Sequence, residues 1–299
     1  MTSPSPALPI LFIGGGNMAQ AIVTGMRQAD ASVMRYDITV VEPDETCRAV
    51  LAQKWGSAVR LHASLTDMQA SPADSVSPLN QGLVQKPAWI VLAVKPQQAQ
   101  EALAPVRAAV SAWGTSPTLL SVAAGVTIAS LSRWSGIEAV VRTMPNTPAM
   151  VQQGVTGAYA VPTISEAARL QADTMLQRLG AVVWVEEEHR LDAVTALSGS
   201  GPAYVFYFLE AFAAAGESLG LPKKDSETLA LQTLKGAIAL LEQTQEPPAV
   251  LRTKVTSKGG TTAAALAVLE KNPGLMGLMH SALTAAHQRA QEMAKDYAA

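Results

Sequence analysis

Residues 10–19 read Ile-Leu-Phe-Ile-Gly-Gly-Gly-Asn-Met-Ala, and this stretch decides the fold of the first half of the chain. The four apolar residues predict a short buried strand, and the glycines open a predicted helix in the pattern G-x-G-x-x-A. In that pattern the first glycine permits a tight turn, the second lets the backbone approach a diphosphate, and the alanine permits close helix packing. Because a helix N-terminus attracts anions, the stretch predicts a dinucleotide site at Gly14, Gly15, Gly16, Asn17, Met18 and Ala19. A glycine-rich turn without a ligand is the alternative interpretation.

Short apolar, β-branched runs alternate with helix-like stretches through the first half of the chain. This alternation predicts an α/β domain of the Rossmann type, with a parallel-rich sheet covered by helices on both faces. Residues 66–87 are rich in Ser, Pro, Gln and Asp without periodicity, which predicts a long surface connection. The predicted strands are 10–13, 38–41, 58–61, 89–94, 119–123, 139–142, 157–161 and 182–185.

The pattern changes near Glu187 to long Ala- and Leu-rich stretches with helical spacing. We therefore expect two domains, residues 1–187 and an all-α domain over residues 188–299. Pro202 and Pro222 are placed to open two of its helices, and Asn272 and Pro273 to start the last one. Several of these helices are apolar on more than one face, so we expect them to bury that surface against a second subunit in a homodimer.

Composition excludes several classes of partner. Apolar residues make up 48% of the 299-residue chain, charged residues 15%, and the net charge is −2, which offers no basic surface for nucleic acid. No apolar run reaches the roughly 18 residues that span a membrane, and no signal peptide is evident at residues 1–9. The single Cys47 fits a reducing compartment, so we expect a cytoplasmic protein. The four histidines are dispersed, and His280 and His287, which could share a helix face, lack the carboxylate or cysteine company of a metal site, so no metal site is expected.

Glu42 ends the second predicted strand. A carboxylate there can accept hydrogen bonds from the adenosine ribose hydroxyls, and it would repel the 2′-phosphate of NADPH. The residue therefore tilts the predicted cofactor preference toward NADH. A solvent-exposed strand end is the alternative, because Arg48 is near enough in sequence to change the local charge.

Four short strings rich in Gly, Pro, Ser and Thr stand out in the rest of the chain: residues 93–96, 144–148, 198–202 and 256–262. The first two follow predicted strands, and ligands of open parallel sheets gather at the carboxyl ends of strands, so both should border the nicotinamide. The last string precedes an Ala-rich helix whose N-terminus would attract a substrate carboxylate. Alternatively, Thr261 or Thr262 is simply the N-cap of that helix.

These motifs favour hydride transfer to an imine. No G-x-S-x-G nucleophile elbow occurs, so acyl transfer has little support. A carbonyl reductase needs a proton donor for the developing alkoxide, whereas an imine can arrive already protonated and needs mainly positioning and a hydrogen bond at nitrogen. Thr262 could supply that bond.

The successive blocks 14–19, 93–96, 144–149, 197–204 and 251–262 resemble those of pyrroline-5-carboxylate reductases, nearly over the whole chain and in order. The resemblance implies reduction of 1-pyrroline-5-carboxylate to L-proline with NADPH or NADH, an N-terminal Rossmann domain and a helical domain that interlocks with a second subunit. A higher oligomer built of dimers stays an open alternative. The resemblance implies cofactor contacts from residues 14–19, Ala93, Val94, Lys95, Pro96, Asn146, Thr147 and Pro148. It implies substrate contacts from Glu188, Ser257, Gly259, Gly260, Thr261 and Thr262, with Thr262 as the catalytic residue.

Two positions depart from the family pattern. Lys258 stands where the family commonly has proline, and Glu42 where NADPH-using relatives tend to have a small hydroxyl residue. Three alternative functions stay open: a related imine reductase, a β-hydroxyacid dehydrogenase-like enzyme, and a nucleotide-sensing protein without catalysis. The dehydrogenase class uses a helical Lys with an Asn close by, and Lys235 has no Asn four residues on.

Overall fold

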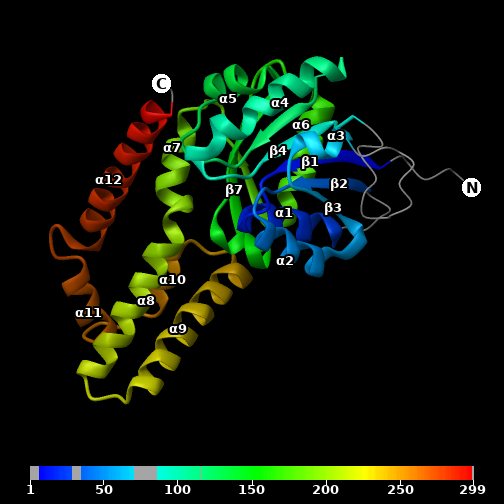
Figure 1. Cartoon of the computed structure of the whole chain (residues 1–299). Helices are drawn as coiled ribbons and strands as arrows, with labels where there is room; N and C mark the ends of the chain where they lie inside the picture. Colours follow the sequence, from blue (N-terminus) through cyan, green and yellow to red (C-terminus); the bar gives the residue numbers. More distant parts are fainter. Residues whose placement is uncertain (1–6, 29–34, 71–85, 115, 298–299) are drawn as a thin grey trace, which may run out of the picture. The chain divides into compact units, whose positions relative to one another are not determined.

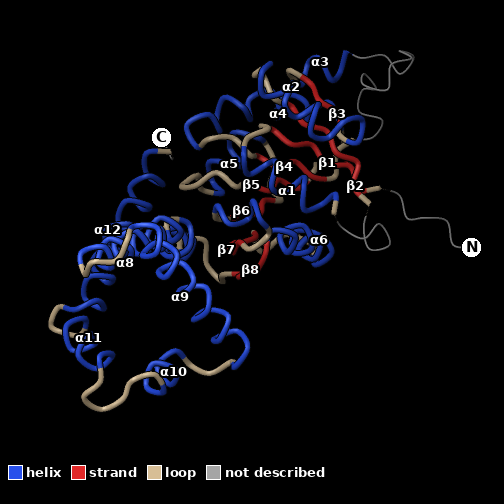
Figure 2. The backbone as a smooth tube through the Cα atoms, turned by 90° about the horizontal axis from the view of Figure 1, so that it is seen from below, coloured by secondary structure: helices blue, strands red, loops and turns tan. Residues whose placement is uncertain are grey.

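The computed structural model describes residues 7–28, 35–70, 86–114 and 116–297. Its sheet, drawn within the whole chain in Figure 1, has eight strands in the order β3-β2-β1-β4-β5-β6-β7-β8, and Figure 2 labels each of them. The first six strands pair in parallel, β7 runs antiparallel to β6, and β8 is parallel to β7. The strands are β1 Leu8–Ile13, β2 Tyr36–Val41, β3 Arg60–His62, β4 Trp89–Leu92, β5 Thr118–Ser121, β6 Val140–Met144, β7 Gly154–Ala160 and β8 Gly180–Trp184.

The predicted strands are all present, and the parallel-rich Rossmann-type sheet is confirmed. Some strand boundaries differ from the predicted ones, because residues predicted as strand belong to a neighbouring turn or because a strand pairs over a longer stretch. The third strand begins at Arg60 rather than at residue 58, because Gly56–Ala58 forms a 3-10 turn. The seventh strand begins earlier than predicted, at Gly154, because it pairs with β8 as well as β6.

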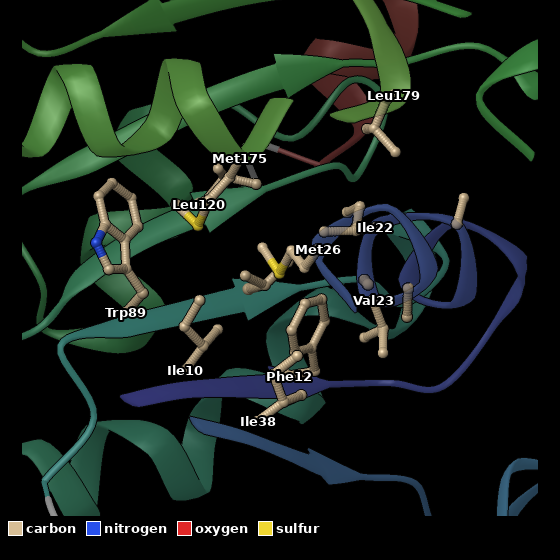
Figure 3. Packing of buried hydrophobic residues seen from close by; sticks show 14 of the residues in the cluster. Ile10, Phe12, Ile22, Val23, Met26, Ile38, Trp89, Leu120, Met175 and Leu179 are labelled. Atoms are coloured by element: carbon tan, nitrogen blue, oxygen red, sulfur yellow. The ribbon is translucent and has the colours of Figure 1, made fainter. Parts of the chain in front are cut away.

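Alternate side chains of β1 belong to two separate hydrophobic cores, one on each face of the sheet. Ile10 and Phe12 belong to a core completed by α1 Asn17–Arg27, α2 Glu45–Trp55 and α6 Glu166–Leu176 (Figure 3). Leu11 and Ile13 belong to the opposite core, completed by α3 Leu65–Ala70, α4 Ala99–Trp113 and α5 Ile128–Ser135. A strand covered on both faces reads as a continuous apolar run, which is why residues 10–13 have no polar alternation.

Polar side chains start several of these helices. Asp44 accepts a hydrogen bond from the Cys47 N–H at the start of α2, Thr127 accepts from Ser130 N at the start of α5, and Ser165 accepts from Ala168 N at the start of α6. Each cap satisfies a backbone donor that the helix leaves without a partner. By contrast, Gly16 precedes α1 without a capping side chain, so that helix start stays open to an anion.

The prediction of a long surface connection over residues 66–87 was wrong at its start, which is helical and partly buried. Residues Leu65–Ala70 form the helix α3, in which Leu65 and Met68 are buried in the core. One turn of amphipathic helix is too short to give a periodic signal among so many polar residues. Residues 71–85 of the predicted connection lie outside the described residues.

The chain divides into two compact units. The first comprises residues 1–199 together with 287–299, and the second comprises residues 200–286. The second unit contains helices and loops alone, as Figure 2 shows by colour. Its helices are α8 Gly201–Ser218, α9 Lys223–Thr244, α10 Pro248–Lys254, α11 Thr261–Leu269 and the first half of α12 Gly274–Asp296.

In the second unit, α8 and α9 form a tight helical hairpin. The Ser226 hydroxyl donates to the Ala213 carbonyl at 2.5 Å, and a Cβ at Gly216 would lie 2.1 Å from the same hydroxyl oxygen. The predicted helix openings at Pro202 and Pro222 are confirmed, as is the last helix after Pro273. Gly220, with φ of +94°, turns the chain between the two helices.

Large apolar side chains of the second unit are exposed within this chain. Over residues 200–286, all of which are described, Ala213, Ser226 and Ala230 are the buried residues. On α8, Phe206 and Tyr207 are 66% and 72% exposed, and Phe208 and Phe212 lie on a neighbouring part of the helix with rings 5.8 Å apart. No helix within the described ranges has the length and apolar character that crossing a membrane demands.

Candidate active site

The glycine loop between β1 and α1 packs closely against neighbouring residues. Gly14 has a φ of +96°, and a Cβ there would lie 2.7 Å from the Ala93 carbonyl oxygen. A Cβ at Gly15 would lie 2.5 Å from Leu51, whereas the nearest atom to one at Gly16 is 3.9 Å away. The first two glycines are therefore required by the protein itself. The third leaves room for a ligand against the backbone, as diphosphate binding demands.

Glu42 lies beside this loop at the carboxyl end of β2. Its Oε2 accepts a hydrogen bond from Gly15 N at 2.8 Å, and its Oε1 accepts one from Asp44 N at 2.9 Å. Arg48 donates from one guanidinium nitrogen to the carbonyls of Glu42 and Pro43, at 2.8 and 2.6 Å. The carboxylate thus has a fixed position facing the loop, with a cation directly behind its backbone.

A cleft of about 720 Å³ opens where β1 and β4 meet at their carboxyl ends. This is the position at which strand order reverses in a doubly wound sheet, and it is where such sheets bind nucleotides. Predicted cofactor residues that line it are Gly14, Gly16, Asn17, Met18, Glu42, Ala93, Val94 and Lys95. Gly15 in the glycine loop, Ala19 in α1 and Pro96 in the turn after Lys95 are not among the lining residues.

Two groups of lining residues were missed by the sequence analysis. Residues 63–66 follow β3, and the rule that ligands gather after parallel strands could have found them. Gln98, Glu101, Ala102 and Pro105 line the cleft from the start of α4. Their spacing of three to four residues marks one helix face, but nothing in the sequence says which partner that face meets.

Asn146, Thr147 and Pro148 follow β6 and do not line this cleft. The Asn146 amide is used inside the first unit, where Nδ2 donates to the Ser198 carbonyl and Oδ1 accepts from Val155 N. It ties the end of β6 to β7 and to the π-helical turn Thr195–Gly199. Thr147 and Pro148 begin the 3-10 turn Thr147–Val151. Their cofactor contacts stay a prediction.

Glu188 is part of a buried ion-pair cluster. Its Oε1 accepts from the Ile128 N–H at 2.8 Å and from the Arg142 guanidinium at 2.9 Å, and Asp192 lies 3.6 Å from the same guanidinium. Arg142 is 4% exposed, so its charge needs these two carboxylates. Glu188 therefore holds β6, α5 and α7 Arg190–Val194 together, and its substrate contact stays a prediction.

The second glycine-rich string lies in the second unit, directly before α11. The Gly260 N–H donates to the Ser257 carbonyl at 3.1 Å, and Gly259 has a φ of +74°, where an added Cβ would have no atom within 4 Å. Gly260 is the N-cap, and no side chain caps the helix. The alternative that Thr261 or Thr262 serves as the cap is therefore wrong, because both residues already lie in the first turn.

The only cysteine in the chain contacts the glycine loop. The Cys47 thiol lies 3.7 Å from the Gly15 carbonyl oxygen. Burial, and then the negative charges of Glu42 and Asp44, raise the pKa of this thiol, so it stays protonated at neutral pH and is a poor nucleophile. Among the residues that the structure describes, no cluster of three His, Cys, Asp or Glu side chains is arranged to hold a metal ion.

Comparisons with known proteins place this site in a family. Residues 188–293 match the model for pyrroline-5-carboxylate reductase dimerisation, and residues 9–125 match the model for NADP oxidoreductase, coenzyme F420-dependent. The chain is 38% identical to pyrroline-5-carboxylate reductase of Pseudomonas aeruginosa, over 96% of this chain and 97% of the relative. The chain belongs to the pyrroline-5-carboxylate reductase family.

Solved structures of this family agree with the fold. Pyrroline-5-carboxylate reductase of Coxiella burnetii is 35% identical with a TM-score of 0.81, over 96% of this chain and 99% of that one. Pyrroline carboxylate reductase of Plasmodium falciparum, solved with NADP bound, is 25% identical with a TM-score of 0.74, over 97% and 99%. As a pyrroline-5-carboxylate reductase family member, the protein is an oxidoreductase with a dimerisation region.

Proposed function

We propose that this protein reduces 1-pyrroline-5-carboxylate to L-proline with a nicotinamide cofactor, as the last step of proline biosynthesis. One observation carries the proposal. A dinucleotide cleft in the first unit and an uncapped, glycine-turned helix start in the second occur in one chain of this family. The first suits a nucleotide diphosphate and the second suits a small carboxylate.

The substrate is assigned to the turn before α11. The first backbone N–H groups of α11 have no intrahelical partners, and no side chain occupies them, so they are available to the substrate carboxylate. Ser257, Gly259, Gly260, Thr261 and Thr262 supply this pocket, and the charge of the exposed Lys258 adds to its attraction for an anion. The family resemblance also assigns a substrate contact to Glu188, which in the first unit is paired with Arg142.

The reaction needs little acid or base chemistry from the protein. A nicotinamide held by the glycine loop and residues 93–95 would supply the hydride, and the substrate nitrogen arrives already protonated. Thr262 lies in the first turn of α11, half-buried, with its hydroxyl free of a capping role. Its hydroxyl accepts a hydrogen bond from the protonated ring nitrogen and so orients the ring, which fixes the face of the substrate that accepts the hydride.

We propose that NADH is the preferred cofactor. The Glu42 carboxylate is held by Gly15 N and Asp44 N at the end of β2, where adenosine ribose hydroxyls bind in this fold. A 2′-phosphate there would meet a fixed negative charge. The guanidinium of Arg48 lies at the Glu42 carbonyl and offers a positive charge that attracts a 2′-phosphate. It is the feature of this region that favours NADPH over NADH.

We propose that residues 188–299 form the substrate-binding and dimerisation part of a cytoplasmic homodimer, with residues 1–187 as the dinucleotide-binding domain. The exposed aromatic face of α8 supports self-association, because a stable monomer rarely leaves so large an apolar surface in water. Light scattering at low micromolar concentration should give twice the chain mass or a multiple of it. A monodisperse, active monomer would contradict the assembly.

The activity is tested by mixing the full chain with NADH or with NADPH. Oxidation of the cofactor is measured as the loss of nicotinamide absorbance. Pyrroline-5-carboxylate should start the reaction, and proline should accumulate in equal amount. Cofactor binding without turnover would instead support a nucleotide-sensing protein. A related imine without a carboxylate is the matched control, and it should be reduced much more slowly if the turn before α11 binds the carboxylate.

A further inference from the structure

The last turn of α12 contacts two loops that border the cofactor cleft. α12 ends at Asp296, and residues 287–297 belong to the first unit. The next residue, Tyr297, accepts a hydrogen bond through its hydroxyl from Gln97 Nε2 at 2.9 Å. Its backbone carbonyl accepts one from the Ser130 hydroxyl at 3.1 Å.

Gln97 belongs to the segment that follows β4. It lies in the 3-10 turn Pro96–Gln98, directly after Lys95, and Lys95 and Gln98 on either side of it line the cleft. Two backbone hydrogen bonds hold the turn internally, from Gln98 N to the Lys95 carbonyl at 2.9 Å and from Ala99 N to the Pro96 carbonyl. The phenol of Tyr297 thus bonds this turn through Gln97, a residue that does not itself line the cleft.

The ring of Tyr297 packs on the segment that follows β5. A Cβ at Gly125 would lie 3.3 Å from the Tyr297 ring and 3.1 Å from Met293, and Gly125 has a φ of +76°. Glycine here lets α12 approach closely. Val122, three residues earlier, lines the cleft and packs with the core that contains Phe12, whereas Tyr297 packs with the opposite core, which contains Ile13.

We infer that Tyr297 is a positioning residue for the cofactor, acting through Gln97 on the loop that contains Lys95. The loops after two neighbouring strands must keep a fixed separation for the cleft to fit a dinucleotide, and Tyr297 contacts both. The inference deepens the proposed function, since it concerns how that function's cofactor is held. It makes the end of α12 a part of the cofactor site although it is about 200 residues away from Gln97 in sequence.

Equilibrium binding of NADH and NADPH to the full chain, without substrate, tests this role independently of turnover. Tyr297→Phe keeps the ring on Gly125 and removes the phenol, and Gln97→Ala removes the other partner. Each should raise the cofactor Kd about two- to tenfold, as expected for one lost hydrogen bond. The cofactor Kd of the double variant should be no higher than the higher Kd of the two single variants, because both substitutions remove the same hydrogen bond.

Steady-state kinetics separates positioning from loss of structure. In Tyr297→Phe the KM for the cofactor should rise with the Kd, while kcat and the KM for pyrroline-5-carboxylate stay nearly constant. Tyr36→Phe is the matched control, because the buried Tyr36 hydroxyl has no hydrogen-bond partner within the described chain and lies at the opposite end of its strand from Glu42. An unchanged cofactor Kd in folded Tyr297→Phe, or additive effects in the double variant, would overturn the inference. If the protein binds cofactor but reduces no pyrroline-5-carboxylate, the proposed function fails and the binding test still decides the role of Tyr297.

Discussion

The glycine loop 14–19 and the glycine loop 256–262 look alike in sequence and differ in how the structure holds them. The first is enclosed: Gly14 and Gly15 have neighbours that leave no room for a Cβ, and Glu42 bonds the Gly15 backbone. The second is open: a Cβ at Gly259 would touch nothing, and α11 starts without a capping side chain.

The difference separates two uses of glycine. In the first loop, the glycines let the chain turn closely between β1, β4 and α2. The same turn, which the fold needs in any case, also forms the ligand site. In the second loop, only Gly259's positive φ and the close Ser257 hydroxyl beside Gly260 restrict the residue type. Substitutions in the first loop should therefore affect both folding and cofactor binding, whereas those in the second should affect catalysis with little effect on folding.

Gly14→Val should have the largest effect. A branched side chain at a φ of +96° would overlap the Ala93 carbonyl and Val94, so β1 and β4 would have to separate. We expect the free energy of unfolding to fall by about 3 kcal/mol and the cofactor Kd to rise at least about a hundredfold. Denaturant titration and NADH binding measure the two. Retention of normal binding in a stable Gly14→Val protein would contradict an enclosed loop.

Glu42→Ser should change cofactor preference without changing the fold. A carboxylate facing a 2′-phosphate costs roughly 1–3 kcal/mol at an intermediate dielectric, which corresponds to about a five- to hundredfold effect on relative kcat/KM. The variant should shift the NADPH/NADH ratio upward by that factor, helped by Arg48. Glu45→Ser, at the exposed start of α2, is the control and should leave the ratio nearly unchanged. An unmodified enzyme that already prefers NADPH would show that the interpretation of Glu42 is wrong.

Thr262→Val tests the open loop at constant shape. Removing the hydroxyl should lower kcat/KM for pyrroline-5-carboxylate by on the order of tenfold or more, because a hydrogen bond made in the transition state is lost. The cofactor Kd should not move. Thr228→Val is a matched control, since the Thr228 hydroxyl bonds back to the Lys224 carbonyl on α9. Full activity in a folded Thr262→Val protein would remove Thr262 from the mechanism.

Gly259→Ala should have the smallest effect on stability, and it completes the contrast with Gly14. The new Cβ meets no atom, so the cost is that of a positive φ alone, roughly 1 kcal/mol. Thermal unfolding should show a small decrease in Tm, with cofactor binding unchanged and a few-fold rise in the KM for pyrroline-5-carboxylate. A loss of stability as large as that of Gly14→Val would mean that the second loop is enclosed as well.

Local sequence patterns predicted most of the first unit because its signals are local. A buried parallel strand reads as a run of apolar residues, and a glycine turn between strand and helix has few alternatives. The sequence alone therefore predicts the glycine turn of residues 10–19, the strands and the position of Glu42 at the end of β2. The helix α3 could not, since one buried turn carries too few residues for a periodic signal.

Contacts between distant residues were decided by the tertiary structure alone. The family resemblance implies ligand contacts for Asn146 and Glu188, and these stay predictions. The structure adds that the Asn146 amide bonds Ser198 and Val155 and that Glu188 pairs with the buried Arg142, and neither contact has a signal in the sequence. Tyr297 had no motif at all, and its contact with Gln97 exists because α12 returns to the first unit.

The sequence by itself determined which stretches are strands, which turns need glycine and which residue types can bind a dinucleotide, because steric and hydrogen-bonding rules act within a few residues. The tertiary structure decided which polar groups face a ligand and which are used up inside the protein. That choice depends on the partners that folding brings within about 3 Å, and a buried polar group must take whichever partner is there. Sequence spacing carries no information about that distance.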